Sequence, residues 1–360
     1  MKRTFIIIWF GLFSMAGFAQ ETNAYTFFVN VVNDNFKFPL IGFVNMAKGD
    51  HKGIQLGFVN WNVRDFTGLQ TGFVNTTGGN LIGAQFAFIN TNIQKVQGAQ
   101  IGFINSATQV VHGAQIGFMN TAIKELHDAQ VGFVNTALNE VRGVQMGFVN
   151  TTIKASHGVQ MGFVNSAIKA SRGVQMGFVN VTRRKETGVQ LGFFNYVDTL
   201  EKGVPIGFLS IIRRGGYLAL ETGFSEFFPV MVGFKTGVEK FYTTLYIAYR
   251  PFESSSKNRY ATGVGFGSII PLKKSFFFNP ELHLFNPIEK KNNRQLSSII
   301  PLFGYHFNRH FSITAGPSVV WSNCEADAVL LKPVFYLANF DINNKNAIFV
   351  GARAGLRYRF

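Results

Sequence analysis

The chain has 360 residues, a formal net charge of +15 and one cysteine, Cys324. A single cysteine excludes an intrachain disulfide, and its position far along the chain leaves no thiol to carry the lipid of a lipoprotein. The positive charge predicts anionic partners such as acidic membrane lipid, lipopolysaccharide or another surface polyanion. Phenylalanine accounts for 41 residues, an excess that suits a chain whose strands meet lipid.

The first 19 residues have the layout of a secretory signal peptide. Lys2 and Arg3 precede an apolar run from Phe5 to Phe18, and cleavage is expected after Ala19. Export makes nucleic acid a poor candidate partner. No later stretch approaches 18 uninterrupted apolar residues, so the sequence predicts no membrane-spanning helix.

Residues 25–210 form an array with a period of 15 residues. A Phe recurs thirteen times at this interval, from Phe28 to Phe208, without an insertion. Each unit repeats one short motif, clearest as GVQMGFVN at 158–165, in which a Gln stands five residues before a closing Asn. A period of this kind determines the architecture and is therefore interpreted before single residues.

The spacing of inward-type residues predicts a three-sided β-solenoid with one unit per coil. Apolar or small residues stand four and two before the Asn, one and three after it, and six and eight after it. We therefore expect inward pairs every five residues, with Gly or Asn at the corners. Each Phe should then pack in a dry core on the Phe of the next coil, and each Gln or Asn amide should bond its own copy. The expected ladder residues are Phe103, Phe118, Phe133, Phe148, Phe163, Phe178, Gln115, Gln130, Gln145, Gln160, Asn120, Asn135, Asn150 and Asn165.

A single large antiparallel barrel of about 22 strands is the alternative. Within GVQMGFVN, apolar and polar residues also alternate as they do in a transmembrane β-strand. Two observations count against it. The uncharged stretch is about eight residues, shorter than a tilted spanning strand needs, and the turns do not alternate in length or chemistry as those of a meander should.

Basic residues and histidines recur seven residues after the Asn and would form a ridge along one edge of a solenoid. Such a ridge could dock a polyanion or an anionic membrane surface, although solvated corners also tolerate charge without any role, and Glu125 and Glu140 dilute the ridge. No carboxylate or cysteine column accompanies the histidines, so no metal site is expected. The candidate contact residues are His112, His127, Arg142, His157 and Arg172.

Residues 217–360 lose the 15-residue register and consist of longer alternating segments. The last segment, IFVGARAGLRYRF at 348–360, places apolar side chains on one face and Gly and Arg on the other. Eight or nine such segments are present. Because bacterial barrels close on even numbers, the sequence predicts an antiparallel β-barrel of eight strands, with ten as the second choice.

No set of residues in this chain predicts catalysis or cofactor binding. Alternating glycines at 263–267 lie in a strand that no helix follows, so they are interpreted as small residues facing the barrel interior rather than as a phosphate loop. Glu281 and His283 share a strand face with Asn279, where a polar barrel interior requires such residues in any case. We expect a non-enzymatic protein without cofactor or metal.

The repeat unit resembles that of the glycine-rich surface-repeat proteins of Gram-negative bacteria, whose units read GxQxGFxN; the match covers Gly42 to Ser210. The last segment, with Tyr358 and Phe360, is similar to the closing strand of bacterial outer-membrane barrels. The first resemblance implies an envelope location. The second implies that the terminal aromatic strand is recognised by the barrel-assembly machinery and that the barrel lies in outer-membrane lipid.

A solenoid followed by a barrel is also similar to the autotransporter layout, in which the barrel anchors an exposed passenger. This analogy implies a non-enzymatic outer-membrane protein that presents a repeat rod for adhesion or surface structure. The alternative function is a pore or transporter formed by one large barrel and lined by the Gln column. A lipid-modifying hydrolase on an eight-stranded barrel would need a Ser, His and acid set that cannot be placed in this sequence.

Overall fold

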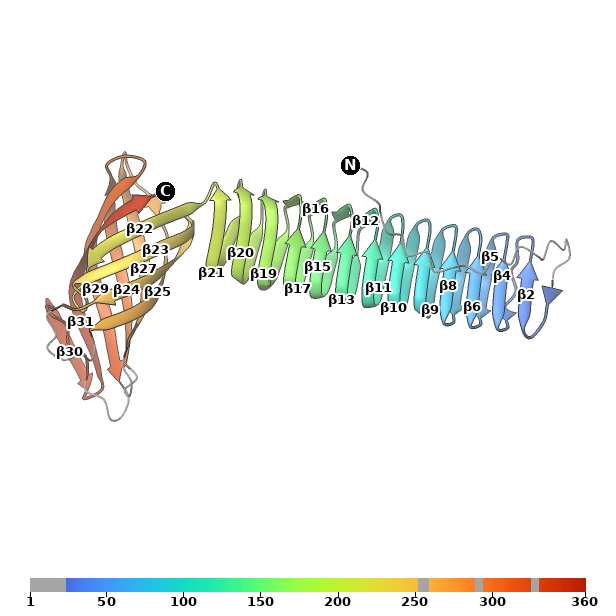
Figure 1. The fold of residues 1–360 in the computed structure, drawn as a ribbon, viewed down its shortest axis with the longest axis horizontal. Helices are drawn as coiled ribbons and strands as arrows, with labels where there is room; N and C mark the ends of the chain where they lie inside the picture. The colour runs from blue at the N-terminus through green and yellow to red at the C-terminus, as the bar shows by residue number, and fades with distance from the viewer. Residues whose placement is uncertain (1–23, 252–258, 289–293, 325–329) are drawn as a thin grey trace. The chain divides into compact units, whose positions relative to one another are not determined.

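The computed structural model describes residues 24–251, 259–288, 294–324 and 330–360, and these ranges are all-β (Figure 1). Two compact units divide the chain, Met1–Gly117 and Phe118–Phe360. The expected signal peptide, residues 1–19, lies outside the described residues. Within the described residues there is no helix of the length and apolarity that a membrane crossing requires.

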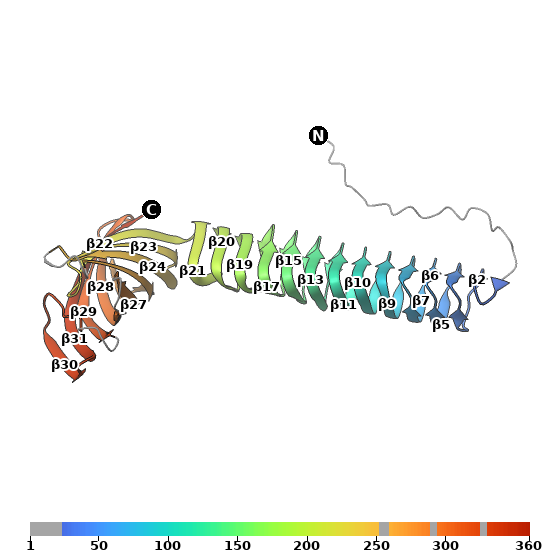
Figure 2. The ribbon, with the colours of Figure 1, turned by 60° about the horizontal axis from the view of Figure 1, so that its bottom comes forward.

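The array is a parallel β-solenoid of about twelve coils, as predicted. In Figures 1 and 2 the strands of successive coils lie side by side. Up to the unit boundary the strands are β1 (Ala24–Tyr25), β2 (Val29–Val32), β3 (Leu40–Ile41), β4 (Val44–Ala47), β5 (His51–Leu56), β6 (Val59–Asn62), β7 (Phe66–Thr71), β8 (Val74–Thr77), β9 (Leu81–Asn92), β10 (Val96–Ala107) and β11 (Val111–Ala122), which runs across it. Beyond it they are β12 (Glu125–Leu126), β13 (Ala129–Ala137), β14 (Glu140–Val141), β15 (Val144–Thr152), β16 (Ala155–Ser156), β17 (Val159–Ala167), β18 (Ala170–Ser171), β19 (Val174–Lys185), β20 (Val189–Leu200) and β21 (Val204–Arg214).

From β2 onward, strand pairing in the array is parallel and advances by one repeat. Between β15 and β17, Gln145 lies opposite Gln160 and Asn150 opposite Asn165. Equal positions of neighbouring units therefore stack on one another. A single large barrel would require antiparallel neighbours, so that alternative for the array is wrong.

The interior of the coils differs from the expectation. Gln145, Asn150 and Thr152 are fully buried, whereas Phe148 is 45% exposed and Met146 is 39% exposed. The inward positions are the Gln, the Asn, and the residues two and six after the Asn. The prediction that the Phe column packs in a dry core is therefore wrong. A shift of one residue in a strand exchanges its two faces. On two of the three predicted sides, the residues expected to point inward are the sequence neighbours of those that do.

Amides fill the interior because each one bonds its own copy in the next coil. Asn150 Nδ2 donates to Met161 O at 2.8 Å and to Asn165 Oδ1 at 2.9 Å. Gln160 Nε2 donates to Gln145 Oε1 at 2.8 Å. A coil of 15 residues encloses a narrow space, which the slender amides fill together with one apolar side chain six residues after the Asn, such as Phe66, Leu126 or Val141. Because the amides are paired along the column, their burial leaves few unsatisfied polar groups.

Glycines of the repeat are fixed by this close stacking. A Cβ on Gly162 would lie 2.0 Å from Gly147 O and 2.6 Å from Asn150 Nδ2, so any larger residue would push neighbouring coils apart. Gly83 has a φ of 131°, a left-handed conformation that side chains rarely adopt. Close stacking therefore favours Gly at these positions in most coils, although Ala87 stands at one of them and Asp128 at another.

The C-terminal part is a closed antiparallel barrel of eight strands among the residues that the structure describes, in agreement with the first prediction. The barrel strands are β22 (Tyr217–Phe224), β23 (Val230–Val238), β24 (Phe241–Tyr249), β25 (Tyr260–Gly267), β27 (Phe276–Pro287), β28 (Arg294–His306), β29 (Phe311–Cys324) and β31 (Asn346–Arg359). Two short strands, β26 (Ile270–Pro271) and β30 (Ala338–Asn343), pair only with β27 and β31 respectively. The first and last barrel strands close the ring, with Leu220 opposite Tyr358 and Glu221 opposite Arg357.

The barrel is apolar outside and polar inside. Ile299, Val319 and Leu356 are 64%, 44% and 47% exposed, whereas Arg353 and Arg357 are 3% and 1% exposed. The alternation predicted for 348–360 is thus confirmed for the two arginines and the apolar residues between them. Both features follow from the two-residue period of a strand in a closed sheet.

Both ends of the array are covered. At the first coil, β1 pairs antiparallel with β2. At the last coil, Thr243 Oγ1 donates to Gly207 O at 2.6 Å, and Thr236 Oγ1 donates to Ser210 O. No further coil follows to supply backbone N–H donors to these carbonyls. The threonine hydroxyls of the barrel donate to them instead. Capping of this kind protects the open edge of a stacked sheet.

Candidate functional site

The most extended surface feature of the array is its ladder of phenylalanine rings. Neighbouring rings from Phe118 to Phe193 lie 4.9–5.0 Å apart with planes within 5° of parallel. Each of these six rings is 44–49% exposed. In the first unit Phe88 stacks on Phe103 at 4.8 Å, and Phe103 is 43% exposed. The expected Phe ladder residues therefore lie on the outer surface, where they can contact a partner.

The expected amide ladders lie inside instead. Each of the eight expected Gln and Asn ladder residues is at most 1% exposed. They hold the coils in register and are not available to a ligand. Their role in this structure is the positioning of the outer columns.

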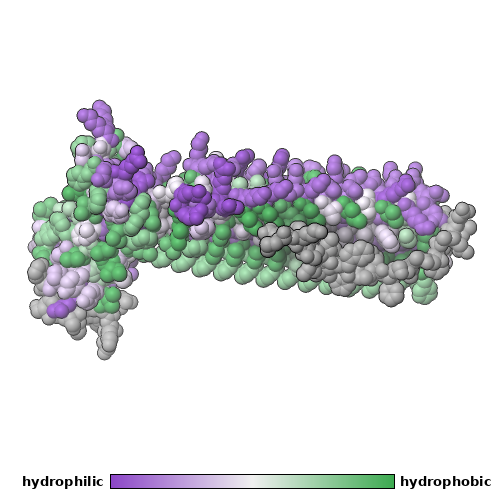
Figure 3. Space-filling model, turned by 45° about the horizontal axis from the view of Figure 1, so that its top comes forward, coloured by the Kyte–Doolittle hydropathy of each residue, from purple (hydrophilic) through white to green (hydrophobic). Residues whose placement is uncertain are grey.

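A second apolar column runs beside the rings, four residues before each Asn. Val131, Met146, Met176 and Leu191 of this column are 38–48% exposed. Figure 3 shows the result in space, with apolar bands along the array and hydrophilic side chains gathered along one edge. Polar and apolar residues are thus segregated around the coil.

The predicted basic ridge is largely neutralised by carboxylates on the same edge. His127 Nε2 lies 3.0 Å from Glu125 Oε2, and Arg142 Nη2 lies 3.4 Å from Glu140 Oε2. Arg172 forms an ion pair with Glu186. His112 and His157 complete the column of five. Three of the five candidate polyanion contacts therefore have an acidic neighbour, and the described residues show no group of metal-binding side chains.

The barrel interior holds a buried ionic cluster around Glu221 on β22. Its Oε1 accepts from Arg353 Nη2 at 3.1 Å, and its Oε2 accepts from Arg357 Nη2 at 2.7 Å. Lys235 Nζ lies 3.5 Å from Oε2. These four side chains are at most 3% exposed. The cluster links β22, β23 and β31 through ion pairs. Breaking one of these buried pairs would leave an uncompensated charge, which is strongly destabilising.

Glu281 on β27 extends the cluster to the opposite wall. It accepts from Lys235 Nζ at 2.6 Å and contacts His283 Nε2 at 2.7 Å. Tyr242 donates to the same carboxylate. The predicted polar group on this strand thus lies in the barrel interior, where it joins a network of charges from four strands.

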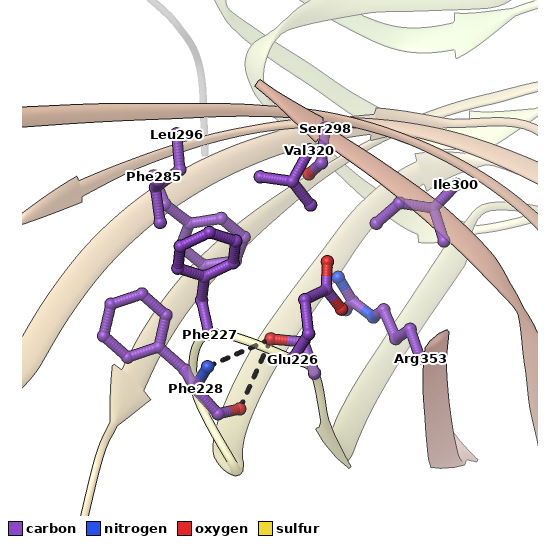
Figure 4. A pocket seen from close by; sticks show the side chains of 10 residues that line it. Glu226, Phe227, Phe228, Phe285, Leu296, Ser298, Ile300, Val320 and Arg353 are labelled. Atoms are coloured by element: carbon purple, nitrogen blue, oxygen red, sulfur yellow. Dashed lines mark hydrogen bonds between the residues drawn. The ribbon is translucent and has the colours of Figure 1, made fainter. Parts of the chain in front are cut away.

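One end of the barrel interior is closed by the turn after β22. Figure 4 shows Glu226 and Arg353 pointing toward one another, while Phe227, Phe228 and Phe285 gather beside them. A cavity beside these residues has a volume of about 20 Å³, space for about one water molecule. Side chains therefore fill most of this end of the barrel interior, as is usual for eight strands.

Sequence reasoning missed the partners in this cluster. Arg353 and Arg357 were assigned to the inner face, but Glu221 and Lys235 were not singled out. The available signal was a charged residue at an inward position of each strand. Sequence alone could not pair them, because Arg353 and Glu221 are 132 residues apart.

Lys185 was also missed. Its ammonium is buried in the coil interior, where Nζ donates to Ser171 Oγ at 3.0 Å and to Gly173 O at 2.6 Å. Burial lowers the pKa of Lys185 to about 8. Among the described residues it forms no ion pair, and two neutral acceptors hold the charge.

Aromatic side chains line one end of the barrel wall along β27, β28, β29 and β31. Phe276 contacts Tyr305 at 5.0 Å between ring centroids, and Phe311 contacts Tyr358 at 5.1 Å. Phe360 lies 5.2 Å from Tyr358. All five are exposed on the outer wall. The two residues of the expected assembly signal, Tyr358 and Phe360, therefore belong to this aromatic rim.

No protein-family model, no curated protein and no solved structure matches this chain.

Proposed function

We propose that the chain is a non-enzymatic outer-membrane protein, anchored by its C-terminal barrel, whose repeat array serves adhesion or surface structure. The observation that carries the proposal is the inverted polarity of the barrel. Its outer wall is apolar and its interior contains the buried charges of Glu221, Lys235 and Arg357. A protein surrounded by water gains nothing from this arrangement, whereas one surrounded by lipid requires it.

Two further features support a location in the membrane. The aromatic rim around Tyr305 and Tyr358 corresponds to the girdle with which transmembrane barrels meet the lipid headgroups. Aliphatic residues such as Ile299 and Val319 lie opposite each other farther along the strands. On this account Phe360 remains a predicted contact of the barrel-assembly machinery, and outer-membrane lipid is the predicted surrounding.

The filled interior favours an anchor over a pore. Ions would have to pass the buried cluster of Glu221, Glu281 and their three cationic partners, which lies across the barrel interior. The exposed columns of the array are then the surfaces through which the protein acts. Lipopolysaccharide or another surface polyanion stays a candidate partner of the basic edge.

A charge placed on the outer wall tests the membrane location. Ile299→Arg should destabilise the protein in bilayers by about 2–4 kcal/mol, because it places a guanidinium against lipid. The matched control is Ile168→Arg, at an array residue that is 48% exposed, which should change stability by less than about 0.5 kcal/mol. Urea unfolding of protein refolded into liposomes measures both. An Ile299→Arg effect no larger than that of Ile168→Arg would contradict the proposal.

A further inference from the structure

One face of the array carries no charge in any unit. The six residues before each Asn, for example Val144–Val149 and Val159–Val164, contain no Asp, Glu, Lys, Arg or His anywhere between Ala24 and Leu209. All charged residues and histidines between Asn30 and Ser210 stand three to eight residues after the closing Asn of a repeat. We call the exposed side chains four and two residues before the Asn, which include Met146 and Phe148, the ring face.

The ring face is a regular ridge rather than a featureless apolar patch. Its rings repeat at 4.9–5.0 Å and are nearly coplanar from Phe118 to Phe193. A partner that packs against several coils at once must repeat at the spacing of neighbouring strands. A second copy of the same array meets this condition along the whole face, as paired sheets do in dry, interdigitated interfaces.

The exposed area is large enough for a stable pair. If a phenylalanine side chain offers roughly 200 Å², the six rings from Phe118 to Phe193 expose roughly 550 Å² at 44–49% exposure. The neighbouring column, with Val131, Met146, Met176 and Leu191, raises this to roughly 800 Å². A standard protein interface buries about that area on each partner.

The edges of the ring face favour a protein partner over an anionic lipid surface. Membrane-surface elements border their apolar face with free cations. Here three members of the basic column beside the face, His127, Arg142 and Arg172, are paired with Glu125, Glu140 and Glu186. We propose that the ring face is an interface at which two copies of this chain pair. Pairing requires only the array and does not depend on where the barrel resides.

Single cysteines on the ring face test the pairing. In a full-length chain carrying Cys324→Ser, cysteines replace Val131, Met146, Met161 or Leu191 one at a time, and Lys154→Cys on the exposed charged edge is the control. Protein in liposomes is treated with a short bis-maleimide and analysed by gel for covalent dimers. Copies that run in the same direction should cross-link at all four positions, and copies that run in opposite directions should cross-link only near the middle of the paired face. Lys154→Cys should give no dimer.

A charged substitution on the ring face is the second test of the pairing. Met146→Lys should reduce the dimer formed through Met161→Cys by roughly tenfold or more, because an unpaired ammonium would be buried. Lys154→Glu should leave that dimer unchanged.

Other occupants of the face give other results, and each overturns the proposal. Absence of dimers together with quenching of a fluorophore on these cysteines by spin-labelled lipid would show that lipid covers the face. Absence of dimers together with maleimide labelling as fast as at Lys154→Cys would show that water does. Equal cross-linking of the face and of the control would show random collision.

Discussion

At the residue scale, the array reverses the usual distribution of side chains. Asn150 is buried and accepts from Asn135 Nδ2 at 2.9 Å while it donates to Met161 O and Asn165 Oδ1. Phe148 is half exposed between the rings of two neighbouring coils. The amide column should therefore contribute more to stability than the ring column does.

Two alanine substitutions in one coil test this order. Asn150→Ala should cost about 3 kcal/mol or more, because several buried groups lose their partner at once. Phe148→Ala should cost about 1–2 kcal/mol, since one ring stack and part of the ring's buried area are lost but no internal cavity forms. Urea unfolding of the array, followed by circular dichroism, compares the two. A larger loss for Phe148→Ala would mean that the rings form the core after all.

Lys185 gives the array a dependence on pH. Its pKa is about 8 in the folded chain against an ordinary 10.5, so between these values the unfolded chain binds more protons and stability rises with pH. Below pH 8 the full cost of the buried charge applies, at most about 3 kcal/mol. Lys185→Met should therefore stabilise the array at pH 7, and the gain should shrink at pH 10.

Lys169→Met on the exposed edge is the control for the loss of a lysine at the surface of the array. The free energy of urea unfolding at both pH values decides the matter. An equal gain at pH 7 and pH 10 for Lys185→Met would contradict a charged lysine in the coil interior.

The limits of sequence reasoning are clearest at single residues. The exact 15-residue interval was enough to predict coils in which Gln145 stacks under Gln160. It could not decide which side chains point inward. The usual rule buries a large apolar residue such as Phe148 and exposes a polar one such as Asn150, whereas the coil does the reverse. Only the pairing of amides between coils makes the polar interior favourable, and that energy is invisible in an isolated repeat. Lys185 breaks the pattern for one coil and could not be foreseen.

At the scale of elements, one coil is the unit of folding. Neighbouring coils interact mainly with each other, so stability is approximately a sum of nearest-neighbour terms. Deletion of 143–157, one complete repeat, should leave a folded protein, because β17 can take the place of β15 with the same register. Deletion of 143–149 should disrupt the array, since it brings unlike positions opposite one another.

Circular dichroism and limited proteolysis of both deletion variants measure the outcome. The same loss of β-structure in both would contradict a stack of equivalent coils. For the barrel, the alternation of 348–360 was sufficient to predict strand faces, and the eight or nine alternating segments predicted eight strands because bacterial barrels close on even numbers. It was insufficient for the cluster around Glu221, whose members come from strands distant in the chain.

At the scale of the whole molecule, the central claim is that lipid surrounds the barrel and not the array. The chain contains three tryptophans, of which Trp9 lies in the expected signal peptide. Trp321 is 52% exposed on the barrel wall, and Trp61 is 37% exposed on the array. Each can therefore report on the surroundings of its own part.

Quenching of tryptophan fluorescence by lipids brominated near the headgroup is the most direct measurement. In proteoliposomes, the Trp61→Phe variant retains Trp321, whose emission should fall strongly as brominated lipid replaces ordinary lipid. The Trp321→Phe variant retains Trp61, whose emission should stay unchanged. Emission of Trp321 that is insensitive to brominated lipid, in protein that remains bound to the vesicles, would contradict the account.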